Sequence, residues 1–186
     1  MKELTKCKSC GYIMEKGKLK DKCPACGVPA RMFEPYSENI SLARKKILAL
    51  DIHPVMVHFP QAFTFTILAI LVAVNFLSGE IRTELFATAK ILSICLPVAV
   101  IGTVCAGILD GKVRFRKINT PVLVRKIMLS SVFLILAVAN LVVALSYTFS
   151  STGIIIVGIA LMTGALICGS VLALIGVGLI NAKFPG

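Results

Sequence analysis

Residues 7–27 read CKSCGYIMEKGKLKDKCPACG, and this stretch decides how the N-terminal part of the chain folds. Cys7 and Cys10 form one Cys-x2-Cys pair, and Cys23 and Cys26 form a second pair after twelve intervening residues. Each pair occupies a tight turn that directs two thiolates at one point, so the two pairs predict a tetrahedral four-thiolate site for zinc or iron. Such a short segment cannot bury much apolar surface, and the metal would therefore stabilise the fold itself.

The residues around the two pairs resemble the C-terminal rubredoxin domain of rubrerythrins over residues 5–36. The matching features are Cys-Gly-Tyr after the first pair, the twelve-residue gap, the sequence Cys-Pro-Ala-Cys, and the neighbours Phe33 and Glu34. Those domains hold one iron in four thiolates and pass single electrons, so the resemblance implies one iron on the four cysteines, with zinc as the alternative. Residues 15–22 are basic where such domains are often acidic, which leaves the soluble partner open.

The composition of the rest of the chain is that of a membrane protein. Of the 186 residues 57% are hydrophobic, the mean hydropathy is +0.90, and the apolar residues follow residue 53. A bilayer core requires about 20 apolar residues per helix. Four segments meet this requirement, at about 55–77, 87–109, 124–147 and 153–180. The predicted fold is a membrane all-α four-helix bundle (53–186) with a small N-terminal rubredoxin-like metal-knuckle domain (1–36).

The distribution of basic residues predicts the orientation of the bundle. Ten of them flank the predicted spans on the side of the two termini: Arg44, Lys45, Lys46, Lys112, Arg114, Arg116, Lys117, Arg125, Lys126 and Lys183. The opposite side offers only Arg82 and Lys90. The positive-inside rule therefore places the termini and the cysteines in the cytoplasm, at the plasma membrane. There, four cysteines favour metal binding over disulfides, and the net charge of +11 requires no nucleic acid as partner.

A linker, residues 37–52, joins the two predicted domains. Basic residues separate apolar residues that recur at helical spacing. These apolar residues are Ile40, Ala43, Ile47 and Leu50. This pattern predicts an amphipathic helix that lies on lipid at the cytoplasmic interface. Alternatively, the linker extends the first span, although Asp51 and Pro54 favour a break between them.

Both histidines of the chain lie in HPVMVHFPQAF, residues 53–63, at the start of the first predicted span. An ionisable side chain at membrane depth is a candidate functional residue. Positions five apart on a helix point about 140° apart, so His53 and His58 cannot clamp one haem within one helix. A haem would need a ligand from another helix, for which Met128 is the candidate, with Arg125 and Lys126 near its propionates. Alternatively, each protomer of a homodimer would donate one histidine. Interfacial solvation, hydrogen bonding and the positive-inside rule are the plainer explanations of these residues.

The same stretch resembles a broad family of small four-helix membrane proteins whose first span begins His-Pro-x-x-Val-His-Phe-Pro-x-Ala. The resemblance covers about residues 50–150 and suggests haem b binding. The chain departs from that family in having no tryptophan and no third histidine.

Together these features predict a membrane-anchored rubredoxin-type one-electron transfer protein. Electrons would pass between a cytoplasmic redox partner and a membrane redox centre, either haem b or quinone near His58. The alternative is a zinc-ribbon membrane scaffold or interaction module without a redox role. No nucleophile–base constellation or phosphate-binding loop occurs, so any oxidoreductase activity would belong to the cofactors.

Overall fold

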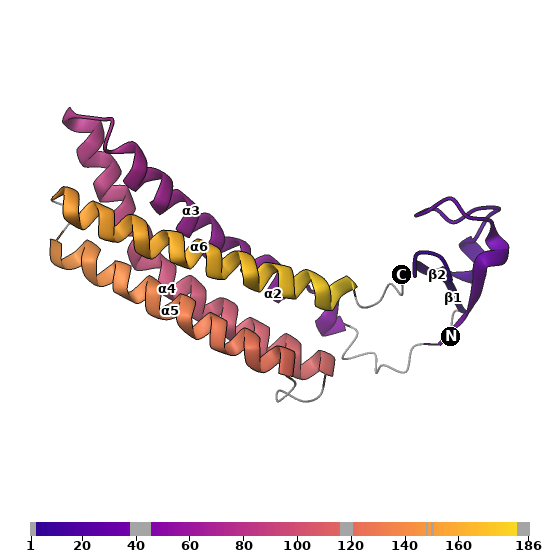
Figure 1. Ribbon diagram of the computed structural model, residues 1–186. Helices are drawn as coiled ribbons and strands as arrows, with labels where there is room; N and C mark the ends of the chain where they lie inside the picture. Colours follow the sequence, from indigo (N-terminus) through magenta and orange to yellow (C-terminus); the bar gives the residue numbers. More distant parts are fainter. Residues whose placement is uncertain (1–2, 38–45, 116–120, 148, 150, 182–186) are drawn as a thin grey trace. The chain divides into compact units, whose positions relative to one another are not determined.

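The computed structural model describes residues 3–37, 46–115, 121–147, 149 and 151–181 (Figure 1). The chain divides into two compact units, of which one is mostly Met1–Leu42 and the other is Ala43–Ile175. Each unit is described by itself. Half of the predicted amphipathic linker, residues 38–45, lies outside the described residues.

The N-terminal unit is built on a three-stranded antiparallel sheet with the order β2-β1-β3. The strands are β1 (Leu4–Cys7), β2 (Ile13–Glu15) and β3 (Phe33–Tyr36), with 3-10 turns η1 (Lys16–Lys18) and η2 (Ala30–Met32) beside them. Pro35 has no backbone N–H to donate. It is tolerated in β3 because β3 is an edge strand and pairs on one side only. The hydroxyl of the buried Thr5 donates to the Glu34 carbonyl oxygen at 3.0 Å and ties β1 to β3.

The second unit is helical. Its helices are α2 (Ile52–Met56), α3 (His58–Ala73), α4 (Gly79–Phe115), α5 (Pro121–Tyr147) and α6 (Thr152–Asn181). Within the described residues, four segments are long and apolar enough to cross a membrane: Lys46–Ala73, Gly79–Val113, Pro121–Tyr147 and Thr152–Val177. The predicted fold class is thereby confirmed, with a small cysteine-knuckle domain followed by four long apolar helices.

A break in the chain does occur at Asp51. This residue has a left-handed backbone (φ 46°, ψ 36°), and α2 begins directly after it. Pro54 occupies the first turn of α2, where a backbone N–H would have no helical acceptor, so the proline is tolerated. At the other end of α3, the side-chain amide of Asn75 donates to the Leu71 carbonyl oxygen at 2.8 Å and closes the helix.

The helices pack around one apolar core. Its most buried members come from all four long helices: Ile67, Leu71, Val74, Ala89, Leu96, Val100, Ala137, Ala144, Ile155, Met162 and Ala165. A polar link crosses this core, because Asn140 Nδ2 donates to Ser93 Oγ at 2.8 Å and Ser93 Oγ donates to the Ala89 carbonyl oxygen at 2.7 Å. Polar side chains in the interior of a membrane bundle join helices in this way, which fixes α5 against α4.

Candidate metal centre

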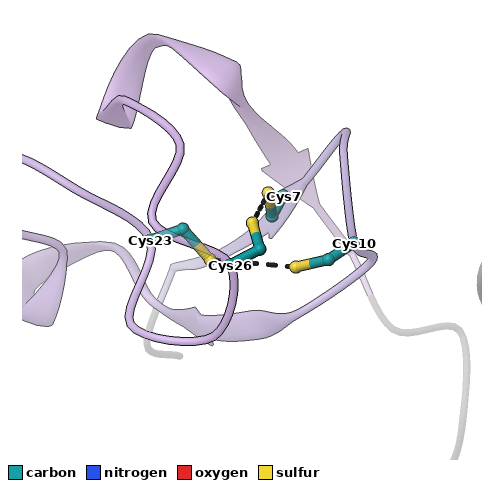
Figure 2. Close-up of side chains that lie close together, drawn as sticks. All are labelled: Cys7, Cys10, Cys23 and Cys26. Carbon is teal, nitrogen blue, oxygen red and sulfur yellow. Dashed lines mark hydrogen bonds between the residues drawn. The ribbon is translucent and has the colours of Figure 1, made fainter.

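The four cysteines of the N-terminal unit converge on one point. Cys7 ends β1, Cys10 lies in the turn that follows, and Cys23 and Cys26 lie in a second turn (Figure 2). All four sulfur atoms lie within 4.8 Å of one another. Across the two pairs, Cys7 Sγ is 3.8 Å from Cys26 Sγ and Cys10 Sγ is 3.8 Å from Cys23 Sγ.

The sulfur spacing fits a tetrahedral metal ion. A metal–sulfur bond of about 2.3 Å produces a tetrahedron whose edges measure about 3.8 Å. A disulfide would need about 2.05 Å between the sulfur atoms, whereas the two short distances are 3.8 Å. The four thiolates would therefore hold one ion as its complete ligand set, which suits zinc and iron alike.

The two turns repeat one backbone pattern. In each turn, the amide of the first cysteine donates to the carbonyl oxygen five residues later, and the amide four residues later donates back. These bonds are Cys7 N to Tyr12 O, Gly11 N to Cys7 O, Cys23 N to Val28 O, and Gly27 N to Cys23 O, all 2.8–2.9 Å long. Gly11 (φ +74°) and Gly27 (φ +76°) follow the second cysteine in the left-handed region. The sequence Cys-x2-Cys-Gly therefore predicts this turn, because glycine adopts a left-handed backbone without steric cost.

Gly27→Ala isolates the contribution of that left-handed backbone. An alanine Cβ would meet nothing within 4 Å, so the substitution carries only the backbone strain. We expect metal binding to weaken by about 5- to 30-fold, which corresponds to the 1–2 kcal/mol cost of a left-handed residue with a side chain. Gly17→Ala is the control, because Gly17 has open space and no positive φ. Competition with a chelator measures both; equal affinities would contradict the argument.

The protein environment acts on the thiols in opposite directions. Burial raises the pKa of Cys23, but N–H groups of Cys26 and Ala25 and the neighbouring thiols outweigh it and lower the pKa to about 7. The Tyr12 amide lowers the pKa of Cys10, yet desolvation and the three other thiols raise it to about 12. Negative thiolate charges repel one another, so four adjacent thiols do not all ionise readily without a metal. A bound cation favours the thiolate form of all four.

The metal centre has a buried side and an accessible side. Cys7 is fully buried and Cys23 is 3% exposed, whereas Cys10 is half-buried and Cys26 is exposed. The second cysteine of each pair therefore lies at the protein surface, on the side from which another molecule can approach. Such an edge is what a small electron carrier needs, and the same exposure would make a structural zinc accessible to chelators.

The basic segment 15–22 is partly neutralised within this unit. Lys16 Nζ lies 2.9 Å from a Glu3 carboxylate oxygen, and Lys18 Nζ lies 3.3 Å from a Glu15 carboxylate oxygen. Lys20 and Lys22 are exposed and form no such ion pair with another described residue.

The four residues predicted for a membrane site are placed differently from one another. His53 on α2 is half-buried, and its Nδ1 lies 3.2 Å from the Thr103 carbonyl oxygen of α4. His58 is exposed, and its Nδ1 donates to the Pro54 carbonyl oxygen of its own segment at 2.8 Å. Arg125 and Met128 of α5 are also exposed. His53 is one of the residues that line a pocket between helices.

That pocket has a volume of about 60 Å³ and lies between α2, α4 and α5. Its walls include His53, Thr103, Gly107, Lys126 and Ser130. A haem macrocycle is far too large for it. Sequence reasoning had singled out Lys126 beside Arg125 but missed Thr103, Gly107 and Ser130, although the small residues Gly102 and Gly107 on the second span could have indicated close helix approach there.

Comparison with known proteins identifies the N-terminal unit. Residues 6–34 match the family described as rubrerythrin, rubredoxin-like domain. No curated protein and no solved structure matches the chain. The rubredoxin-like nature of the four-cysteine domain is thereby confirmed, whereas the resemblance of the helical part to the His-Pro-x-x-Val-His-Phe-Pro family stays a prediction.

Proposed function

We propose that this protein is a membrane-anchored one-electron carrier in which a single iron, held by the four clustered cysteines, exchanges electrons between a cytoplasmic partner and a redox molecule in the membrane. The observation that carries the proposal is a rubredoxin-like domain with tetrahedral sulfur spacing on a chain with four apolar helices. The iron, when bound, supplies a one-electron couple.

The protein's own groups suit that role. Backbone N–H groups of Cys26 and Ala25 lower the pKa of the Cys23 thiol. Groups that favour the thiolate in this way also tune the potential of an iron–thiolate centre. Two of the cysteines are buried, which limits access of water to the iron. The other two, Cys10 and Cys26, lie toward the surface, where a partner can come close enough to exchange an electron.

The charge of the domain bears on its partner. Lys8, Lys20 and Lys22 are exposed, and Lys8 and Lys22 each adjoin a cysteine ligand in the sequence. A basic surface beside the metal centre favours an acidic redox protein as the cytoplasmic partner, through electrostatic steering. Raised ionic strength should therefore slow this exchange.

The orientation follows from the sequence. Basic residues concentrate at the ends of the spans that adjoin the termini, and the positive-inside rule assigns these ends to the cytoplasm of a cell with the protein in its plasma membrane. The helices then serve as an anchor that keeps the carrier at the surface where it meets both a soluble partner and lipid-dissolved molecules.

Membrane vesicles of opposite orientation test the redox role and the orientation together. Dithionite, which crosses membranes slowly, should bleach the ferric absorption of inside-out vesicles at once. Right-side-out vesicles should bleach only after detergent is added. A chain without iron absorption would overturn the redox role, whereas immediate bleaching of intact right-side-out vesicles would overturn the orientation.

A further inference from the structure

The helical unit holds His53 in a defined seat on α4. A Cβ at Gly107 would lie 2.8 Å from His53 Cε1 and 3.1 Å from its Nδ1, so only glycine leaves room for the ring. His53 Nδ1 lies 3.2 Å from the Thr103 carbonyl oxygen. A carbonyl oxygen can only accept, so Nδ1 carries the proton and Nε2 of the neutral ring is a hydrogen-bond acceptor.

The proline of the His-x4-His-Phe-Pro stretch explains why α2 docks at this point. Pro60 has no N–H, so the Met56 carbonyl oxygen four residues earlier lacks its helical donor. The Thr103 hydroxyl lies 3.0 Å from that oxygen and 2.8 Å from the Ala99 carbonyl oxygen, and thus supplies the missing donor. A Cβ at Gly102 would lie 3.2 Å from Met56 Cε, so this glycine also admits α2. The seat of His53 is therefore built by several residues.

The pocket beside His53 combines apolar walls with a few polar groups. Its volume is about 60 Å³, and Val104, Ile108, Leu123 and Ile127 supply much of its wall. Lys126 and Ser130 of α5 add an ammonium and a hydroxyl group to the lining. A ligand that fits this chemistry is apolar and carries both an O–H group and an acceptor oxygen. Small-molecule pockets usually measure about 300–1,000 Å³, so this smaller pocket can admit only one edge of such a ligand.

We propose that this pocket binds the ring edge of a quinol or quinone, with the quinol O–H donating to His53 Nε2 and Lys126 or Ser130 donating to a ring oxygen. The remainder of the ring and its tail would lie in lipid.

This inference deepens the proposed function and rests on it for the fate of the electrons. Oxidation of one quinol to the quinone breaks two O–H bonds and releases two electrons and two protons. The two electrons would reduce two ferric centres, one each, to the ferrous state. One proton would pass to His53 Nε2 and from there to the aqueous phase. The second proton would pass to the aqueous phase directly.

Nitrogen NMR can observe this site directly, because the chain contains only two histidines. The zinc-loaded full-length protein, with ¹⁵N-labelled histidine, is titrated in detergent with menadiol without oxygen. We expect the His53 Nε2 signal to shift to saturation and the His58 signals to stay in place, with His58→Gln used for assignment. An unchanged His53 signal, or a shift caused equally by inorganic phosphate, would overturn the proposal.

Matched variants add a second measurement. His53→Gln and Gly107→Ala should each weaken menadiol binding by about tenfold or more, since each removes the aligned acceptor. His58→Gln makes the same change at the exposed histidine and should alter the affinity less than about twofold. Ser130→Ala, which leaves the seat of His53 intact, should weaken binding by about two- to tenfold. Equal affinities for all four variants would contradict the assignment.

The experiment separates this inference from the proposed function. Zinc carries no redox chemistry, so menadiol binding to the zinc-loaded protein does not depend on whether the natural metal transfers electrons. If the iron form bleaches on reduction but menadiol leaves His53 unaffected, only the quinol site is wrong.

Discussion

Cys7→Ser should remove most of the bound metal and unfold the N-terminal domain. Cys7 is fully buried at the end of β1, and its sulfur lies 3.8 Å from that of Cys26 in the cluster. A serine hydroxyl is a poor ligand for zinc or iron, and metal binding supplies much of the folding energy of so small a domain. We expect a loss of about 100-fold or more in metal affinity. Metal per purified chain and thiolate-to-iron absorption measure the change.

Cys95→Ser is the matched control for this variant. Cys95 lies on α4, is exposed, and does not belong to the four-cysteine cluster. Its replacement should leave metal content and absorption unchanged. Normal metal content in Cys7→Ser, or metal loss in Cys95→Ser, would show that the ion is bound elsewhere.

Leu71→Ala should destabilise the helical unit by about 2–5 kcal/mol, the usual cost of removing a large buried side chain. Leu71 on α3 is fully buried, and its Cδ1 would lie 2.9 Å from a Cβ placed on Gly158, so it packs closely against α6. Reversible unfolding by SDS in mixed micelles, followed by circular dichroism, measures the difference in free energy.

Leu174→Ala makes the same change on the outer surface of the bundle. Leu174 on α6 is 73% exposed, and lipid or detergent can fill the space that the substitution leaves. We expect a change below about 0.5 kcal/mol, as for most surface substitutions. Similar losses for Leu71→Ala and Leu174→Ala would mean that the α3–α6 packing is wrong.

The metal centre was largely predictable from the sequence. The Cys-x2-Cys spacing and the glycine after each pair dictate a local turn, and a local turn needs no knowledge of distant residues. The sequence could not predict that Cys7 Sγ lies 3.8 Å from Cys26 Sγ and Cys10 Sγ lies 3.8 Å from Cys23 Sγ. That pairing depends on how the two turns meet through the sheet, which is a tertiary property.

The helices were predictable as elements but not in their rotation. A bilayer demands long apolar helices, so composition alone identified four of them. Helices that are apolar on all sides carry little signal for the face that packs. Hence the sequence could not show that His53 faces α4 while His58 is exposed. The contact of Thr103 with the Met56 carbonyl oxygen, which decides this rotation, joins residues 47 positions apart.

The visible absorption spectrum of the purified protein, with metal analysis of the same sample, tests the central claim most directly. The account predicts one iron per chain and thiolate-to-iron charge-transfer bands that bleach on reduction with one electron and return on oxidation. A colourless protein with one zinc per chain would contradict it, and would leave a structural zinc domain on a membrane bundle.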